Sequence, residues 1–367
     1  MAAEQGQLGQ GLRLTDLLAQ RSIPLLTPEL PGTSGLVRVA EDDFYVEELP
    51  LYEPSGAGEH LYLTVEKRGR STVEVAAEIA RNLGARERDV GTAGLKDKRA
   101  VSVQRISVLS KATPEEALRL QGRGFRVLAA GRHGNKLRPG HLRGNRFRIV
   151  VRGVVPEAIA RARTVCARLA ETGVANLFGP QRFGKHGDNA ELGRAILLRE
   201  RQVRDRFLRR IALSALQSEL FNRCLAARIA DGLFATAIDG DVLKKRATGG
   251  LFVCDDPRAD APRVLAGELD PAGPLPGHSL FASRGEAARR EQAVLVASHI
   301  DPESFASAGD ETQGARRPYR IAPSELRVEP AGDDALVVSF ALPKGSYAVS
   351  VLREISKNDV EEADSSA

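Results

Sequence analysis

The chain has few cysteines and no long apolar run, and both absences limit what it can be. Its three cysteines, Cys166, Cys224 and Cys254, are far apart and form no CxxC pair. We therefore expect small buried residues in a reducing cytosol rather than disulfides or metal ligands. No stretch approaches the roughly eighteen apolar residues of a membrane span. The first residues include Glu4 and no apolar run of a signal peptide, so we expect a cytoplasmic protein with no membrane partner.

Metal ligands and nucleotide-binding loops are also missing. The six histidines include no HxH or HxxxH pair, so we expect no metal site. The segment Gly179–His186 nearly matches a P-loop, but His186 stands where the magnesium-binding Ser or Thr belongs. The bulky side chains of Arg182 and Phe183 also suit a phosphate-cradling loop poorly. Nucleotide hydrolysis is therefore not expected.

What the chain does have is size and concentrated basic charge. Its 367 residues are 42% hydrophobic, enough for a large core and two domains. The net charge is only +5, but six Lys and Arg residues and no acid lie in 131–150. A second patch, 194–210, has seven arginines against Glu200 and Asp205. Such patches suit a phosphate backbone, although a solvated face is the alternative, above all for the second patch.

The hydrophobic pattern predicts an α+β fold. Alternation indicates strands at 35–39, 44–48, 60–66, 102–109, 125–130, 147–151, 326–329 and 335–342. A 3.6-residue period indicates helices at 72–83, with Thr72 as the cap, at 156–172 and at 211–229. Glycines, prolines and charges dominate 239–290. The change of character from 173 to 321 indicates an insertion between two parts of one domain.

The most informative segment is Ala93–Gln104, in which one carboxylate, Asp97, lies among Lys96, Lys98 and Arg99. Nearby positive charge favours the ionised form of an acid, so we expect Asp97 to be a carboxylate. A carboxylate on a basic loop can be a salt-bridge anchor, or it can be a nucleophile that faces an anionic substrate. The motif alone leaves both interpretations open.

Further motifs follow in a fixed order. They are Glu41–Glu48, Gly58–Leu61, Arg132–Arg138, Gly144–Phe147, Asn176–Gly184, Leu342–Ala348 and Leu352–Glu354. With the Gly-x-Lys-Asp segment that ends at Asp97, this series resembles the TruD family of tRNA pseudouridine synthases. The resemblance runs from about residue 36 to 356, nearly the whole chain.

The resemblance implies a discontinuous catalytic domain of pseudouridine-synthase fold. This is a circularly permuted, mixed antiparallel sheet flanked by helices, with an inserted α/β TRUD domain. We expect a mobile N-terminal segment at 1–33, the catalytic domain at 34–172 and 322–356, and the inserted domain at 173–321. Residues 357–367 are rich in Asp and Glu and are expected to form an acidic disordered tail.

The resemblance also implies an activity. The family isomerises uridine to pseudouridine at tRNA position 13 without cofactor or metal, and the aspartate that matches Asp97 is its nucleophile. The carboxylate could add to C6 of uracil or attack C1′ of the ribose, and the sequence does not choose between these routes. We expect tRNA as the partner and a monomeric enzyme.

Residues that support this chemistry are predicted in the same way or from their charge. Lys96, Lys98, Arg99 and Arg353 are candidate cations for Asp97. In the family, positions that match Phe44, Asn145 and Tyr347 are associated with substrate binding, and Phe147 belongs to the same group of candidates. An aromatic side chain in a strand is ordinarily a core residue, and an Asn after Gly is ordinarily a turn residue. The candidate phosphate contacts, which would set affinity rather than specificity, are Lys136, Arg138, Arg143 and Arg182.

Two other functions fit part of this pattern. An RNA-binding or RNA-folding protein without chemistry would share the basic patches but would not need Asp97. An RNA hydrolase could pair Asp97 with Glu47 or Glu48, and it would require magnesium.

Overall fold

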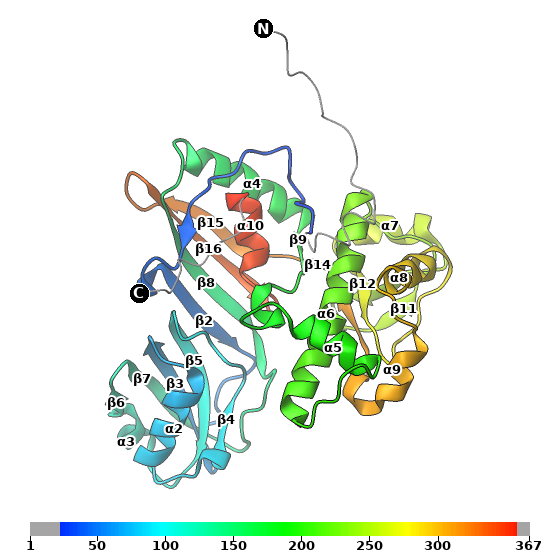
Figure 1. The fold of residues 1–367 in the computed structure, drawn as a ribbon. Helices are drawn as coiled ribbons and strands as arrows, with labels where there is room; N and C mark the ends of the chain where they lie inside the picture. The colour runs from blue at the N-terminus through cyan, green and yellow to red at the C-terminus, as the bar shows by residue number, and fades with distance from the viewer. Residues whose placement is uncertain (1–22, 358–367) are drawn as a thin grey trace. The chain divides into compact units, whose positions relative to one another are not determined.

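The structure is a computed structural model that describes residues 23–357, and these residues divide into two compact units. Glu29–Glu171 together with 322–357 form what we call the discontinuous unit (Figure 1). Thr172–Ile321 form the inserted unit, with which residues 23–28 are grouped. The chain therefore leaves the first unit after Glu171 and returns to it at Ala322.

The discontinuous unit is built on a ten-stranded sheet with the order β15-β16-β8-β2-β5-β3-β7-β6, where β1 also pairs with β8 and β4 with β5. Only the β2–β5 pair is parallel. The strands are β1 (Leu36–Val37), β2 (Phe44–Pro50), β3 (His60–Arg68), β4 (Val90–Thr92), β5 (Val101–Leu109), β6 (Gln121–Gly122), β7 (Phe125–His133), β8 (Leu142–Arg152), β15 (Ser324–Pro330) and β16 (Ala335–Pro343). The β15–β16 pair beside β8 shows that segments from both ends of the chain complete one sheet.

The α+β prediction is confirmed, with differences at the ends of elements. The expected strand at 35–39 stops at Val37 because Arg38 adopts a left-handed backbone conformation, with φ of 59°. The cap predicted for the helix at 72–83 is also wrong by one residue. Ser71, not Thr72, caps the helix, and its hydroxyl accepts from the Glu74 amide while the Glu74 carboxylate accepts from the Ser71 amide.

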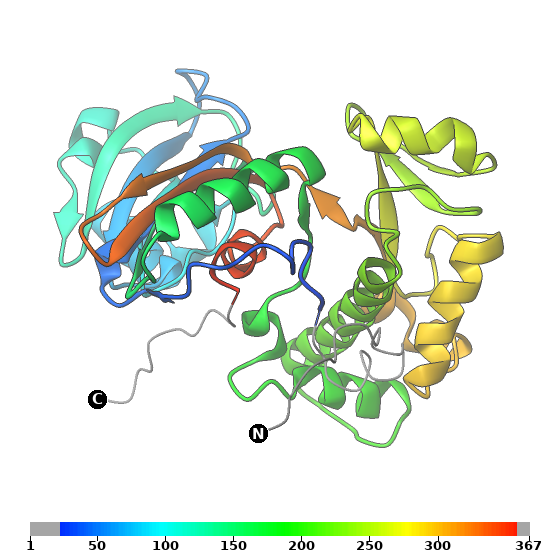
Figure 2. The same cartoon turned by 90° about the horizontal axis from the view of Figure 1, so that it is seen from above.

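Four helices accompany this sheet, α2 (Thr72–Asn82), α3 (Pro114–Leu118), α4 (Ala158–Thr172) and α10 (Val349–Ser356). Val75 and Ile79 of α2 are fully buried against Leu61, Leu63 and Val65 of β3. Figure 2 shows α4 and α10 on one side of β15 and β16. One face of the sheet therefore carries helices, and the odd-numbered side chains of β3 point to it.

The inserted unit combines a four-stranded sheet with five helices of its own among the described residues. Its sheet has the order β11-β10-β12-β13. The elements are α5 (Asn189–Leu197), α6 (Arg206–Ala230), β10 (Val242–Lys245), β11 (Leu251–Val253), α7 (Pro257–Leu265), β12 (Leu269–Leu275), α8 (Gly285–Ala297), α9 (Glu303–Ala308) and β13 (Ala315–Pro318). The helix predicted at 211–229 is α6, which begins five residues earlier because Asp205 caps it.

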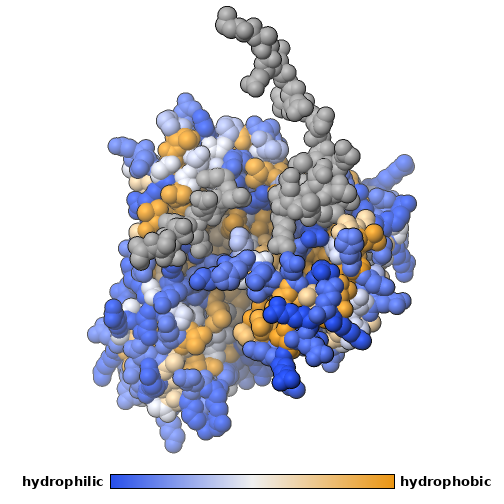
Figure 3. All heavy atoms as spheres, in the orientation of Figure 1, coloured by the Kyte–Doolittle hydropathy of each residue, from blue (hydrophilic) through white to orange (hydrophobic). Residues whose placement is uncertain are grey.

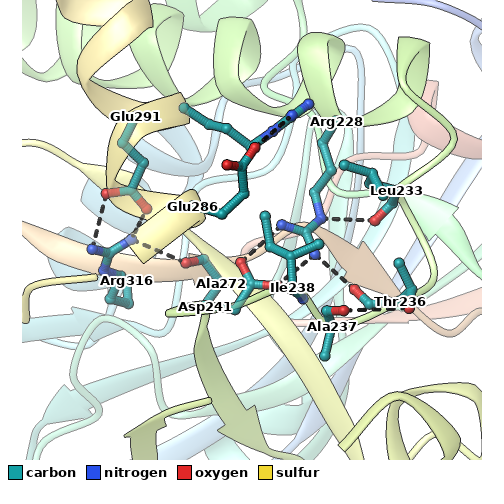
Figure 4. A network of polar contacts seen from close by, with 11 residues as sticks. Arg228, Leu233, Thr236, Ala237, Ile238, Asp241, Ala272, Glu286, Glu291 and Arg316 are labelled. Atoms are coloured by element: carbon teal, nitrogen blue, oxygen red, sulfur yellow. Dashed lines mark hydrogen bonds and ion pairs between the residues drawn. The ribbon is translucent and has the colours of Figure 1, made fainter. Parts of the chain in front are cut away.

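A buried ion pair organises the polar interior of the inserted unit. Arg228 on α6 donates two hydrogen bonds to the Asp241 carboxylate, at 2.8 and 2.6 Å, and both side chains are buried (Figure 4). The same guanidinium donates to the carbonyl oxygens of Leu233 and Thr236. Because a buried charge is tolerated only when it is paired and hydrogen-bonded, this network fixes α6 against the chain that leads into β10.

The entry and exit of the inserted unit lie side by side. Strand β9 (Val174–Ala175) pairs antiparallel with β14 (Arg320–Ile321), and Val174 is opposite Ile321. The two points at which the chain crosses between units are thus held together by a short ladder. This is the arrangement that allows one compact unit to be inserted into another without long connections.

The predicted terminal segments fall mainly outside the described residues, which exclude 1–22 and 358–367. Residues 23–33 of the N-terminal segment predicted to be mobile are described, and Thr33 among them is buried. Its amide donates to the Ile355 carbonyl, and its carbonyl accepts from the Val155 amide. The last residue of that segment is therefore fixed in the discontinuous unit.

Candidate active site

Asp97 lies in the irregular loop that connects β4 to β5. Its side chain is 38% exposed, so the carboxylate is reachable from solvent. Two buried side chains hold the loop backbone from beneath. Lys67 donates through Nζ to the Asp97 carbonyl at 2.6 Å, and the Thr72 hydroxyl accepts from the Lys96 amide at 2.9 Å. The carboxylate is thus an accessible group on an anchored loop.

The cation on this carboxylate is Arg38, which the sequence analysis missed. Arg38 Nη2 lies 2.6 Å from Asp97 Oδ2, and the Arg38 side chain is only 11% exposed. Its guanidinium carbon lies 4.1 Å from the centre of the Phe44 ring. A largely buried guanidinium at this distance forms a charge-assisted hydrogen bond that orients the carboxylate. The one available signal was the charge that interrupts the apolar strand pattern after Val37.

The cations near Asp97 in sequence have other contacts. Lys96 Nζ lies 2.8 Å from Glu48 Oε2, and both side chains are buried. Lys98 Nζ lies 3.9 Å from Glu74 Oε1 at an exposed position. The structure therefore does not place Lys96 on the Asp97 carboxylate, because the Lys96 ammonium is paired with the buried carboxylate of Glu48. Arg99 is exposed on the loop and Arg353 lies on α10.

Lys67 is an unusual residue because it is fully buried. Burial lowers its pKa from 10.5 to about 8, and the negative charge of Asp97 partly opposes this shift. In the β3–β5 register Lys67 is opposite Ser102, on the face that α2 covers. A long cationic side chain without exposure is rarely found in a core unless it has a specific partner. Its partner here is the backbone of the candidate nucleophile.

The predicted substrate-binding residues of β2 and β8 lie on one face of the sheet. The β2–β8 register places Phe44 opposite Ile149, Val46 opposite Phe147, and Glu48 opposite Asn145. Because alternate residues share a face, Phe44, Phe147 and Asn145 point to the same side. The Phe44 and Phe147 rings meet edge to face, with centroids 6.2 Å apart, and both are buried.

Asn145 and Tyr347 are half-buried rather than buried. Within residues 23–357, the buried Oδ1 atom of Asn145 has no hydrogen-bond partner. Buried amide oxygens are nearly always satisfied, so this atom is available to accept a hydrogen bond from a ligand. Tyr347 is half-buried in the turn between β16 and α10. Phe147 is instead stacked on Phe340, with centroids 5.2 Å apart, as expected for a core residue.

The predicted phosphate contacts are divided between the two units. Arg138 and Arg143 are exposed, and Lys136 donates to the Arg88 carbonyl at 2.6 Å, all in the discontinuous unit. Arg182 lies in the inserted unit, half-buried, where it donates to the hydroxyls of Ser218, at 3.0 Å, and Ser214. The first three residues therefore lie in one unit, and Arg182 lies in the other with hydrogen-bond partners there.

The carboxylates that an RNA hydrolase would combine with Asp97 each have a basic partner. Glu48 pairs with Lys96, and Glu47 Oε2 lies 3.0 Å from Arg146 Nη1. Residues 23–357 contain no group of three or more His, Cys, Asp or Glu side chains that could hold a metal ion. No helix in the same range has the length and hydrophobicity to cross a membrane. The site thus presents one accessible carboxylate, a buried guanidinium and an unsatisfied amide oxygen, which suits nucleophilic attack on an electrophilic carbon.

Comparison with known proteins agrees with this chemistry. The family model described as "tRNA pseudouridine synthase D (TruD)" matches residues 21–203 and 201–355. A protein of an Anaeromyxobacter species named tRNA pseudouridine synthase D is 53% identical over 344 residues, covering 92% of this chain and 97% of the relative. A Thermus thermophilus protein of the same name is 45% identical over 335 residues, covering 91% and 92%.

A solved structure shows the same fold. The crystal structure of a Methanosarcina mazei protein described as a tRNA pseudouridine synthase D matches with a TM-score of 0.76 and 24% identity, covering 93% of this chain and 98% of that one. The fold and the sequence together show that this chain belongs to the TruD family of pseudouridine synthases. Its activity is therefore that of an RNA uridine isomerase.

Proposed function

We propose that this enzyme isomerises uridine 13 of tRNA to pseudouridine, with Asp97 as the nucleophile. The observation that carries the proposal is the Asp97 carboxylate itself, accessible at 38% exposure and held 2.6 Å from the largely buried Arg38. Curated relatives named for tRNA cover more than nine-tenths of this chain. The position in tRNA rests on the family resemblance. The proposal also places the enzyme in the cytoplasm, and its action as a monomer stays a prediction.

The reaction requires a nucleophile that allows uracil to be detached from the ribose, to rotate and to be reattached through C5. The Asp97 carboxylate forms a bond either to C6 of uracil or to C1′ of the ribose, and the N1–C1′ bond breaks. The base rotates, C5 bonds to C1′, the C5 proton leaves to solvent, and the carboxylate is released. Arg38 holds the Asp97 carboxylate in position for the first step through its charge-assisted hydrogen bond. Both routes return the enzyme unchanged.

The neighbouring residues have separate roles in this proposal. The Oδ1 atom of Asn145, which has no hydrogen-bond partner within the described residues, accepts from the N3–H of uracil. The half-buried ring of Tyr347 contacts the extruded base. Phe44 contributes to substrate binding, and one side of its ring contacts Arg38. Phe147 contributes by positioning Phe44. Lys136, Arg138, Arg143 and Arg182 contact phosphates.

We propose further that the two compact units have the roles that the family implies. The catalytic domain comprises 34–172 and 322–356, and 173–321 form the inserted TRUD domain. The location of Asp97, Arg38 and Asn145 in the discontinuous unit supports this division. The inserted unit then serves to bind RNA.

The direct test is to map the product. The purified enzyme is incubated with unmodified tRNA transcript in EDTA, and pseudouridine is located by carbodiimide-block primer extension. We expect a single stop one nucleotide before position 13 with the wild type and none with Asp97→Asn. A stop at another uridine would overturn the choice of position 13. RNA binding without any stop would favour the RNA-binding or RNA-folding function.

A further inference from the structure

The connection from α5 to α6 concentrates positive charge that the site above does not use. Residues 199–210, which we call the arginine segment, follow α5 and include the first turn of α6. The segment contains six arginines, Arg199, Arg201, Arg204, Arg206, Arg209 and Arg210. Its two acids are Glu200 and Asp205. The segment lies in the inserted unit, far along the chain from Asp97.

The two acids do not neutralise these arginines. Glu200 pairs with Arg194, outside the segment, at 3.1 Å, and the Asp205 carboxylate accepts from the amides of Phe207 and Leu208. Arg209 pairs with Glu311 at 2.5 Å. Within residues 23–357 the other five arginines form no ion pair, and all five are exposed. Like charges so close together repel one another unless an anion lies between them.

The position of the charge on α6 is also unfavourable for the helix. The first turn of α6 has no acidic residue, and Arg206 is its first residue. Arg206 and Arg210 are four residues apart and therefore lie on one side of the helix. Cations near a helix N-terminus oppose the helix dipole, whereas a phosphate is favoured there. The Asp205 carboxylate already caps this end of the helix, and a phosphate between Arg206 and Arg210 would reduce the repulsion between the two cations.

An aromatic side chain stands in the middle of this charge. Phe207 is 63% exposed and Leu208 is 39% exposed. In the view of Figure 3, hydrophobic residues form patches among hydrophilic ones. Aromatic residues that could stack on a base are few, since the chain has only 12 phenylalanines and no tryptophan. Exposed aromatic rings flanked by arginines are the combination on which nucleic-acid bases stack.

We propose that the arginine segment is an RNA-binding surface of the inserted unit, in which arginines contact phosphates and Phe207 stacks on an unpaired base. This inference rests on the proposed function, which supplies RNA as the ligand. The cations of the segment are all arginines, whose planar guanidinium binds phosphate in a bidentate manner and stacks on bases. Because an aromatic ring can stack only on an accessible base, the segment is suited to a loop rather than a continuous duplex.

A membrane surface is the other partner that basic and apolar residues could suit. Membrane-binding segments of this kind are amphipathic helices with one continuous apolar face. Arg199, Arg201 and Arg204 instead lie in the irregular connection, and the apolar face of α6 is buried in its own unit. The geometry thus favours RNA, and vesicles serve as a test of the alternative.

The test measures affinity for an unmodified tRNA transcript by fluorescence anisotropy over a series of salt concentrations. The variants are the double substitution Arg204→Gln with Arg206→Gln, and Phe207→Ala. The matched controls are Arg258→Gln, an exposed arginine in the first turn of α7, and Leu265→Ala, which removes another exposed apolar side chain of the same unit. All five substituted positions are exposed, and thermal unfolding of each variant checks the fold.

The proposal predicts a different signature for each variant. The double arginine variant should lower the slope of log K against log salt by about 1.4–1.8, since each phosphate contact contributes about 0.7–0.9. Phe207→Ala should weaken binding by about 5- to 150-fold without a change of slope, the range for loss of one base stack. Phe207→Tyr should restore most of it. The controls should bind as the wild type does.

The outcomes separate this inference from the proposed function. Wild-type slope and affinity in both variants would overturn the RNA-binding surface even if the wild type forms pseudouridine. Wild-type protein that forms no pseudouridine, but shows the two predicted losses, would overturn the proposed reaction and retain the surface. If both variants bind tRNA as the wild type does but no longer bind vesicles of phosphatidylcholine and phosphatidylserine, the segment is a membrane-binding surface instead.

Discussion

At the scale of single residues, the site depends on a charge pair between segments far apart in the chain. Arg38 and Asp97 are 59 positions apart and meet at 2.6 Å. The backbone of Arg38 is in the left-handed region, with φ of 59°, where a side chain other than that of glycine is disfavoured. Unfavourable backbone of this kind persists where the surrounding structure fixes it, and it is frequent at active sites. Arg38 is therefore the residue whose substitution is most informative after Asp97.

Replacing Arg38 by Gln should slow pseudouridine formation. The substitution removes a charge-assisted hydrogen bond, which is worth about 1.5–3 kcal/mol, so the single-turnover rate should fall by about 10- to 150-fold. Arg38→Lys should recover part of the rate. Arg152→Gln is the matched control because Arg152 pairs with Asp43 at 2.7 Å elsewhere in the same unit. A control as slow as Arg38→Gln would show that the effect is only structural.

Lys67 should make stability depend on pH in a window set by its burial. Because burial lowers its pKa from 10.5 to about 8, the unfolded chain binds more protons than the folded chain between these values. The free energy of unfolding of the wild type should therefore rise, relative to Lys67→Met, as the pH increases from about 8 to about 10.5. Urea unfolding at several pH values measures this difference. Lys98→Met, at an exposed site, should show no such trend, and parallel curves for Lys67→Met would contradict the burial of a charged lysine.

At the scale of elements, the start of α2 links the helix to the loop that carries Asp97. The Thr72 hydroxyl accepts from the Lys96 amide at 2.9 Å and donates to Gln104 Oε1 at 3.1 Å. Ser71 performs the different task of capping the helix. Of these two neighbouring hydroxyls, that of Ser71 stabilises the helix and that of Thr72 positions the loop.

Thr72→Val should therefore lower the reaction rate, whereas Ser71→Ala should lower the stability of the protein. Thr72→Val leaves the loop amide and Gln104 without their buried partner, and we expect the single-turnover rate to fall roughly tenfold. Ser71→Ala removes a cap and should lower the free energy of unfolding by about 1 kcal/mol with little change in rate. Single-turnover kinetics and thermal unfolding of both variants provide the comparison. Equal rate losses would contradict a specific anchor at Thr72.

The elements also show what the sequence could and could not predict. The apolar pattern located β3 and β16 to within two residues. One face of β3 is mainly buried, whereas β16 is buried on both faces and is apolar almost throughout. No strand was predicted at β12, because it contains Pro271 and Pro274, which ordinarily interrupt a sheet. Its neighbours β10 and β13 decide its conformation. The motif located Asp97, but no local pattern indicated that Lys96 would turn to Glu48 and leave Asp97 to Arg38.

At the scale of the whole molecule, charge and function are divided between two compact units. The net charge of +5 conceals exposed basic groups in both. The pairing of Val174 with Ile321 brings the ends of the inserted unit together, so a short linker can replace it.

A chain in which a short Gly-Ser linker replaces 173–321 should retain a folded discontinuous unit. We expect one cooperative thermal transition, since the ten-stranded sheet draws all its strands from outside the insertion. Affinity for tRNA transcript should fall by about tenfold or more because the arginines of the inserted unit are lost. Anisotropy and calorimetry measure the two effects. A variant without a cooperative transition would contradict the independence of this sheet.

The central claim is that Asp97 is the nucleophile of a uridine isomerase. Conversion to pseudouridine releases the C5 hydrogen, so tritium release from tRNA labelled at C5 of uridine follows the reaction directly. We would measure it under single-turnover conditions for the wild type and Asp97→Asn. The account predicts release by the wild type and a rate at least about 10³-fold lower for the variant. Release by Asp97→Asn at the wild-type rate would contradict it.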